Sequence, residues 1–282
     1  MDQRGIGVLH PGAMGAAVAR QAATGGSPVY WLPAGRGPAT IGRAAEAGLI
    51  PVPDLAAMAG ACWLIVSVCP PAAAREVADL VAATAFTGIY LDANAISPQH
   101  AREIAASLSG AQVVDGGIVG PPPRRTGATT LYLSGPGEAA AEVARVFAAT
   151  ALTPAVLGGP VGQASALKLA FASYNKLSYV LAAQAAGLAA AHGVLPDLLE
   201  LTARKLPETP LGDPARLVTA APRAWRWGPE MREIAEACQA VGLSPDLAVG
   251  AEHLLARWAH HKDTPDRPLA ELLADLADPQ QG

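Results

Sequence analysis

The first part of the chain alternates short apolar runs rich in β-branched residues with alanine-rich segments whose apolar residues recur at helical spacing. Strands are predicted at residues 6–9, 28–32, 63–68, 89–92, 112–114 and 129–134. Helices are predicted between them, for example at 72–83 and 101–108. This alternation predicts an α/β fold with a mostly parallel, doubly wound sheet. Ligands of such a sheet bind at the carboxyl ends of its strands.

The pattern changes near residue 160, after which no segment has the pattern of a strand. Residues 162–192 are predicted to form one long helix, about 45 Å at 1.5 Å per residue. Shorter helices are predicted to follow at 195–206, 225–241, 245–261 and 269–276. We therefore expect two domains: an α/β domain at 1–159 and an all-helical C-terminal domain at 160–282 that begins with the long interdomain helix.

Composition narrows the class of protein. Hydrophobic residues make up 51% of the chain, and the net charge of −4 leaves no broad basic surface, so we expect no nucleic-acid partner. The three cysteines, Cys62, Cys69 and Cys238, contain no CxxC pair, which fits a reducing compartment and no disulfide framework. The sequence has no pattern of a signal peptide and no apolar stretch that spans a membrane, so we expect a cytoplasmic protein.

A glycine-containing turn follows the first predicted strand, in the sequence IGVLHPGAMG at 6–15. Gly12 would let the backbone approach a pyrophosphate at the N-terminus of the next helix, and Gly15 would let that helix pack closely on the sheet. His10 stands where the dinucleotide-binding fingerprint has its first glycine, so an ordinary strand–helix turn remains the alternative. The residues expected to contact the coenzyme here are His10, Pro11, Gly12, Ala13 and Met14.

The end of the second predicted strand favours NADP(H) over NAD(H). NAD enzymes place an acidic residue there for the ribose hydroxyls, but this chain has no acid between Asp2 and Glu46. Arg36 follows the strand instead, with Arg43 further on, and a guanidinium suits a 2′-phosphate. The alternative interpretation of Arg36 is a solvated loop residue.

Four segments resemble the 6-phosphogluconate dehydrogenase-like (β-hydroxyacid dehydrogenase) superfamily, at 7–15, 67–71, 91–98 and 162–168. The resemblance covers nearly the whole chain and implies a Rossmann domain followed by a helical domain. The pairs and runs at 10–11, 115–123, 168–174 and 223–227 resemble a subgroup whose helical C-terminal domain has no known function. Ser67, Val68, Cys69, Pro70 and Asn94 are then expected at strand ends beside the coenzyme.

The resemblance implies that Lys168 is the general acid/base, exchanging a proton with the substrate oxygen. Lys168 lies in an otherwise uncharged stretch of the predicted helix, and partial desolvation would lower its pKa toward neutrality. A lysine that extends to the surface is the alternative.

Two family positions differ in this chain. Val119, Gly120 and Pro121 replace the serine–glycine–glycine segment that holds a substrate carboxylate, so the hydroxyl is missing and Pro121 has no N–H. Ala172 replaces the family's asparagine, and Asn175 lies seven residues beyond Lys168. Asn175 would contact a longer substrate, although an amide on the helix surface is an equal alternative.

Other candidates have simpler explanations. Arg124 and Arg125 would replace the lost carboxylate site, but a solvated loop pair is preferred. The run 225–227, Trp-Arg-Trp, is interpreted as packing at a domain or subunit contact. His260 and His261 have no cysteine or carboxylate at ligand spacing, so no metal site is predicted.

We therefore expect an NADP(H)-dependent oxidoreductase that interconverts an alcohol and a carbonyl of a small-molecule substrate. Imine reduction is an alternative, against which the lysine counts, because imine reductases resemble this architecture but usually carry Asp or Tyr at that position. A dinucleotide-binding protein without catalysis is the third possibility. The apolar stretch 177–191 predicts a homodimer, or a higher oligomer made of dimers, since a small helical domain cannot cover it alone.

Overall fold

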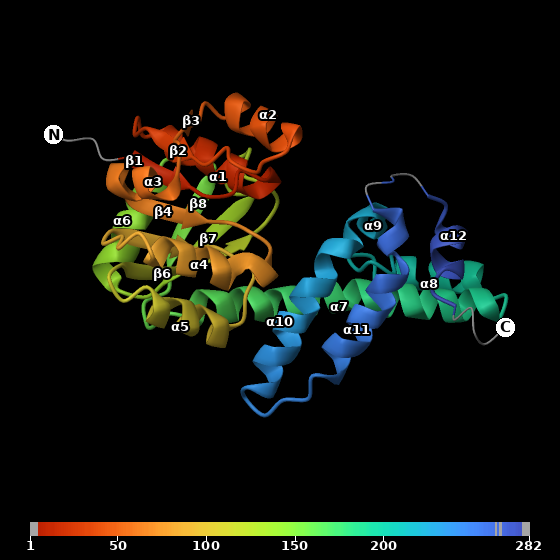
Figure 1. Cartoon of the computed structure of the whole chain (residues 1–282). Helices are drawn as coiled ribbons and strands as arrows, with labels where there is room; N and C mark the ends of the chain where they lie inside the picture. The colour runs from red at the N-terminus through yellow and green to blue at the C-terminus, as the bar shows by residue number, and fades with distance from the viewer. Residues whose placement is uncertain (1–4, 263, 265–266, 278–282) are drawn as a thin grey trace. The chain divides into compact units, whose positions relative to one another are not determined.

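A computed structural model describes residues 5–262, 264 and 267–277 (Figure 1). The chain forms two compact units, Met1–Leu169 and Ala170–Gly282. The division falls inside helix α7 (Gln163–Ala191), whose first turns belong to the α/β unit. It lies ten residues beyond the division expected from the sequence, where the predicted strands end.

The α/β unit is built on an eight-stranded sheet with the order β3-β2-β1-β4-β5-β6-β7-β8. Every neighbouring pair is parallel except β6 and β7, which pair antiparallel. The predicted mostly parallel, doubly wound sheet is confirmed. The strands are β1 (Gly5–Val8), β2 (Val29–Trp31), β3 (Ile50–Pro51), β4 (Cys62–Ser67), β5 (Ile89–Asp92), β6 (Gln112–Val119), β7 (Thr129–Ser134) and β8 (Leu152–Val156).

Three features of the sheet were not predicted. Strand β3 has only two residues, too few for an alternating pattern, and β8 contains Pro154, which weakens the sequence signal of a strand. Strand β6 was predicted to end at residue 114 but continues to Val119. Gly116 and Gly117 lie in this extension, and glycine is depleted in strands, so the pattern ended early.

Helices cover both faces of the sheet (Figure 1). Leu64 and Val66 of β4 pack in one apolar cluster with residues of α1, α2 and α6, whereas Ile65 packs in a second cluster with residues of α3, α4 and α5. This alternation is the period of two that a strand covered on both sides requires. The helical elements of this unit are α1 (Ala13–Ala23), α2 (Pro38–Glu46), α3 (Leu55–Ala61), η1 (Pro71–Ala73), α4 (Ala74–Ala82), α5 (Pro98–Ser107) and α6 (Gly137–Phe147).

The described residues of the second unit form helices joined by turns and contain no strand, as predicted. Helices α10 and α11 pack side by side (Figure 1), and Arg232 of α10 forms an ion pair with Glu252 of α11. Besides the rest of α7, this unit contains α8 (Leu195–Lys205), α9 (Ala215–Ala220), η2 (Ala221–Arg226), α10 (Trp227–Gln239), α11 (Asp246–Arg257), η3 (Ala259–His261) and α12 (Leu269–Ala274). Among the described helices, none combines the length and the apolar character needed to cross a membrane.

A buried carboxylate fixes the start of α7 on the sheet. Asp115 of β6 is 1% exposed. Its Oδ2 accepts hydrogen bonds from the backbone N–H groups of Gly162 (2.9 Å) and Ser165 (3.0 Å) and from the Ser134 hydroxyl (2.9 Å). Its Oδ1 accepts from the Ser165 hydroxyl at 2.5 Å, and the Ser134 Oγ accepts from the Ala164 N–H at 3.0 Å. A negative charge at a helix N-terminus satisfies free N–H groups and opposes the helix dipole.

Replacing Asp115 with alanine should destabilise the protein strongly, because it leaves buried N–H and hydroxyl groups without an acceptor. We expect Asp115→Ala to lower the free energy of unfolding by about 3 kcal/mol or more. Urea denaturation of the full chain measures the loss. Asp54→Ala is the matched control, since Asp54 caps α3 through the Ala57 N–H at an exposed site and should cost only about 1 kcal/mol. Equal small losses in both variants would show that Asp115 does not hold α7.

Candidate coenzyme and active site

The turn after β1 has the geometry of an anion site. The Gly12 N–H donates to the His10 carbonyl at 2.8 Å, and α1 begins at the next residue. A Cβ on Gly15 would lie 2.0 Å from the His10 oxygen, so only glycine allows this close approach of helix and strand. A Cβ on Gly12 would meet nothing within 4 Å, so this position faces open space.

The N-terminus of α1 is left open for such an anion. Gly12 offers no side-chain cap, and the first turn contains no acidic residue. The first N–H groups of a helix need acceptors, and a phosphate supplies them. The turn is placed between the ends of β1 and β4, where the strand order reverses and ligands of doubly wound folds bind.

Two polar side chains beside this turn lack hydrogen-bond partners. His10 is half-buried, and its Nδ1 is buried without a partner among the described residues. Burial, with a smaller contribution from the charge of Arg36, lowers the pKa of His10 to about 4. The Nε of Arg36 is also buried without a partner among these residues. Arg43 is tethered, because its Nε donates to the Pro11 carbonyl at 3.3 Å and its Nη2 to the Thr40 hydroxyl at 2.9 Å.

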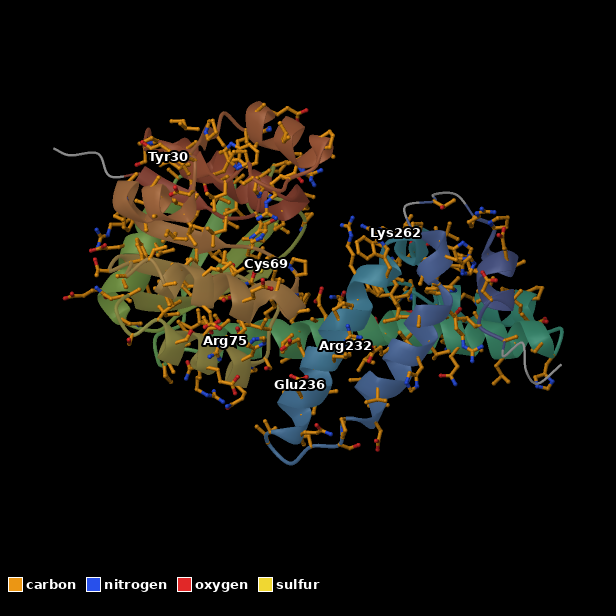
Figure 2. All side chains as sticks on the ribbon, viewed as in Figure 1. Tyr30, Cys69, Arg75, Arg232, Glu236 and Lys262 are labelled. Atoms are coloured by element: carbon orange, nitrogen blue, oxygen red, sulfur yellow. The ribbon has the colours of Figure 1, made fainter. Side chains whose placement is uncertain are left out.

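The ends of β4 and β5 bring together three of the predicted residues. The Asn94 amide donates to the Ser67 hydroxyl at 3.2 Å, and its Oδ1 accepts from the Cys69 N–H at 2.6 Å. The Cys69 thiol lies beside this edge (Figure 2), 3.8 Å from the Ser67 oxygen. Burial raises the pKa of Cys69 to about 11, so the sulfur stays protonated and is no nucleophile. Val68, half-buried, and Pro70, exposed, complete the turn.

Asp92 is a buried acid at this edge to which the sequence analysis gave no role. Its side chain is 1% exposed, and burial raises its pKa to about 7. Its Oδ1 accepts from the Asn94 N–H at 3.0 Å, whereas its Oδ2 and the Tyr90 hydroxyl lack partners among the described residues. The residue stands within the family-like segment 91–98, and that position was the available signal.

Lys168 lies at the extension of β6. A Cβ on Gly117 would lie 3.1 Å from the Lys168 Cβ and 2.6 Å from the Ala164 carbonyl, so glycine at 117 lets α7 rest against the strand. Lys168 itself is half-buried. Val119 is two residues beyond Gly117 on the same face of β6, because strand side chains alternate.

The segment after β6 cannot supply the hydroxyl that the family's serine offers. Val119 is half-buried and apolar, and Gly120 has a positive φ of 127°. Pro121 is exposed, and its carbonyl accepts from the Thr129 hydroxyl at 2.5 Å. The three residues therefore lie where β6 ends and the chain bends, and they have no side-chain donor of their own.

Asn175 and Ala172 belong to the helical unit. Asn175 is exposed and lines a pocket of about 280 Å³ with Tyr179, Ala220, Arg223, Arg226 and Trp227. Ala172 is buried. The expected contact of Asn175 with a substrate stays a prediction.

The run 225–227 packs within the helical unit. The Trp227 ring meets Tyr179 edge-on, with centroids 5.4 Å apart, and Lys262 (Figure 2) places its ammonium 4.3 Å from the centre of Trp225. These contacts agree with the interpretation as packing. Arg124 and Arg125 are both exposed, as a solvated pair would be.

The histidine pair has a carboxylate partner that the sequence analysis did not find. The Nε2 atoms of His260 and His261 lie 3.2 Å and 2.5 Å from Asp275 Oδ2, a carboxylate 14 residues beyond His261. Such a separation in sequence has no ligand-spacing signature, so the sequence analysis missed it. The contacts connect η3 to the end of α12, as does the hydrogen bond from Trp258 Nε1 to the Leu272 carbonyl at 2.9 Å.

Comparison with known proteins identifies the family. Residues 5–158, more than half of the chain, match the family model described as the NAD binding domain of 6-phosphogluconate dehydrogenase. The chain belongs to the 6-phosphogluconate dehydrogenase-like family. Residues 189–258 match DUF1932, a domain of unknown function. The resemblance seen in the sequence is confirmed for the superfamily and for the subgroup. A search of curated proteins found no match.

Solved structures share the fold of the whole chain. A 3-hydroxyisobutyrate dehydrogenase from Mycobacterium tuberculosis, solved with L-serine, matches with a TM-score of 0.76 at 19% identity, over 98% of this chain and 99% of that one. A reductive aminase from Aspergillus terreus with NADPH and ethyl levulinate matches with a TM-score of 0.60 at 21% identity, over 97% and 99%. An imine reductase from the same organism, with NADPH4 and dibenz[c,e]azepine, gives 0.59 at 23%, over 97% and 99%. The Rossmann-type fold of these enzymes is therefore also the fold of this chain.

The buried acid Asp92 should make stability depend on pH. Its pKa is about 7 in the folded protein and near 3.8 when exposed, so the folded state holds the proton more tightly. The associated stability is full below pH 4 and is lost as the pH rises toward 7. Asp92→Asn keeps an acceptor for the Asn94 N–H and removes the charge. The free energy of unfolding of Asp92→Asn, relative to that of wild type, should therefore rise by on the order of 2 kcal/mol as the pH is raised from 5 to 8. Urea denaturation at each pH measures this difference.

Asp79→Asn is the control for that measurement, because Asp79 is exposed and pairs with Arg75 at 3.0 Å (Figure 2 labels Arg75 on α4). Its difference from wild type should stay constant over the same range. A constant difference for Asp92→Asn would mean that Asp92 is ionised throughout.

Proposed function

We propose that the protein is an NADP(H)-dependent oxidoreductase that interconverts an alcohol and a carbonyl, with Lys168 as general acid/base. The observation that carries the proposal is the placement of Lys168 against Gly117, on the extension of β6. This extension continues past the carboxyl end of β5. The glycine turn and the hydrogen-bonded pair of Ser67 and Asn94 also lie at the carboxyl ends of the parallel strands. A dehydrogenase needs a proton donor at the edge where its coenzyme binds.

The chemistry divides between coenzyme and protein. NADPH, when bound, supplies the hydride for the carbonyl carbon. Negative charge then builds on the carbonyl oxygen, and Lys168 neutralises it by giving a proton from Nζ. In the direction of oxidation, Lys168 accepts the hydroxyl proton. Gly12 and the open N-terminus of α1 would hold the pyrophosphate.

NADP(H) is proposed over NAD(H) on two grounds. Arg36 stands after β2, where an acid would bind the ribose of NAD, and no acid occurs between β1 and α2's Glu46. The reductive aminase that shares the fold was solved with NADPH.

Imine reduction is the second candidate function. It is favoured by the structural likeness to a reductive aminase and an imine reductase. The substrate of either reaction differs from a small 3-hydroxy acid held as in the family, because Val119 and Pro121 offer no donor for its carboxylate. A carbonyl panel and an imine panel, each followed through NADPH consumption, separate the two reactions. NADPH binding without turnover on both panels would indicate a dinucleotide-binding protein.

A homodimer is proposed from the surface of α7. Leu181 is 59% exposed and Leu188 is 64% exposed within the described chain, on an apolar stretch of the helix. Exposed apolar area of this kind is normally covered by a partner. Light scattering at micromolar concentration should give twice the chain mass, and Leu181→Asp should shift the protein toward monomer. A monomeric wild type would refute the assembly.

Lys168→Met should abolish most turnover. It removes the ammonium and keeps an unbranched side chain, so the rate should fall by roughly 10²–10⁴-fold, the usual contribution of a general acid. NADPH affinity and the melting temperature should change little, because neither the pyrophosphate site nor the apolar core uses the Nζ. Steady-state kinetics and coenzyme titration measure both effects.

Lys205→Met is the matched control, because Lys205 is exposed at the end of α8. It should keep the wild-type rate. Full activity of Lys168→Met on an accepted substrate would mean that another group supplies the proton.

Arg36→Ala should discriminate between the coenzymes. Loss of a charge-assisted contact costs about 1.5–3 kcal/mol, which corresponds to roughly ten- to hundredfold in NADPH affinity. NADH affinity should stay within about twofold of wild type, because NADH lacks the 2′-phosphate. Fluorescence titration of each coenzyme measures the constants, with the exposed Arg75→Ala as control. Equal losses for both coenzymes would assign Arg36 to the fold.

A further inference from the structure

The two unpartnered nitrogens at the glycine turn belong to neighbouring segments. His10 follows β1 and Arg36 follows β2, and these strands pair in parallel with Val8 opposite Trp31. The two segments therefore leave the sheet side by side. The Arg36 guanidinium lies close enough to lower the pKa of His10 through its charge. His10 Nδ1 and Arg36 Nε are thus two buried nitrogens on neighbouring segments, each without a hydrogen-bond partner among the described residues.

Leaving two such atoms buried without partners is costly. A buried polar group without a hydrogen bond costs about 1–3 kcal/mol, so native proteins rarely keep two together without a function. The Nε–H of a guanidinium is a donor only, and a neutral imidazole donates from one of its nitrogens. The missing partner of Arg36 Nε is therefore an acceptor, and His10 Nδ1 needs the same kind of partner in the tautomer that carries the proton on Nδ1. The positive charge of Arg36 favours an anion.

We propose that His10 and Arg36 together bind the adenosine 2′-phosphate of NADP(H), so that His10 is a second determinant of coenzyme specificity. The proposal rests on the coenzyme assignment of the proposed function. The pyrophosphate has its own donors at Gly12 and the N-terminus of α1. The end of β2, which carries Arg36, faces the adenosine ribose in dinucleotide-binding folds.

The position of His10 explains why a side chain is found there. Dinucleotide-binding turns usually have a glycine at this point, the first of the fingerprint. Here the carbonyl of residue 10 makes the close contacts with Gly12 and Gly15, and the side chain stays outside them. A histidine is therefore compatible with the turn and adds a donor beside the ribose. The pKa of His10, lowered to about 4 by burial and by the charge of Arg36, keeps the ring neutral near pH 7.

The decisive experiment compares coenzyme affinities without substrate. Dissociation constants of NADPH and NADH are measured by fluorescence titration for wild type, His10→Ala, His10→Asn and Arg36→Ala. His10→Ala should weaken NADPH binding by about tenfold, the lower end expected for a hydrogen bond to a charged group, and change NADH binding by less than about twofold. His10→Asn keeps a short amide donor near the position of Nδ1 and should recover part of the loss.

Smaller probes separate the two phosphate positions. Adenosine 2′-phosphate should bind more weakly to His10→Ala than to wild type, whereas adenosine 5′-phosphate should bind equally to both. His253→Ala is the matched control, because His253 is exposed on α11 in the helical unit. Melting temperatures of the variants without coenzyme show whether each variant is folded. If His10→Ala does not fold, His10→Asn takes its place in the comparison.

Three results would overturn the proposal. Equal loss of NADPH and NADH affinity in His10→Ala would assign His10 to the pyrophosphate or to the shape of the turn. Unchanged NADPH affinity in His10→Ala, with a selective loss in Arg36→Ala, would leave the 2′-phosphate to Arg36 alone; the proposed coenzyme would stand and the role of His10 would fall. A wild type that binds NADH as tightly as NADPH would instead refute the coenzyme assignment, together with this proposal.

Discussion

The carboxylate of Asp115 is the interaction on which the placement of α7, and with it of the proposed active site, depends. It is buried in the middle of β6 and accepts hydrogen bonds from two backbone N–H groups at the start of α7 and from two serine hydroxyls. A charge placed this deep is tolerated because every bond it accepts replaces one to water, and because it meets the positive end of a helix dipole. The result is a fixed origin for a helix of 29 residues.

Because the start of α7 is fixed on β6, the position of Lys168 on this helix is fixed as well. Strand β6 continues past the end of β5, and α7 runs against this extension because Gly117 has no side chain to keep it away. The position of the lysine thus follows from one carboxylate and one glycine in the same strand. Val119 ends β6 two residues beyond Gly117, so its side chain differs in place from the two contacts that hold the helix.

At the glycine turn after β1, several hydrogen-bond donors have no acceptor among the described residues. Gly12, the uncapped N-terminus of α1 and the nitrogens of His10 and Arg36 all offer donors, and the described residues give them few acceptors. Burial raises the pKa of Asp92 to about 7, so this acid carries less negative charge near neutrality than an exposed aspartate does. Two of the buried polar atoms that lack partners among the described residues, His10 Nδ1 and Arg36 Nε, therefore lie beside the turn where a coenzyme is proposed to bind.

The sequence by itself determined the alternation of strands and helices, the glycine turn, the long helix and the family, because each depends on local patterns or on contiguous motifs. It also placed Ser67, Cys69 and Asn94 at strand ends, and the structure joins them by hydrogen bonds. Only the tertiary structure decided that Asp115 caps α7, that Gly117 receives Lys168, and that Asp275 meets the two histidines. Those contacts join residues that the sequence separates by 14 to 51 positions, and no local pattern encodes such pairs. The strands β3 and β8 were missed for a related reason, since their pairing partners, and not their own residues, make them strands.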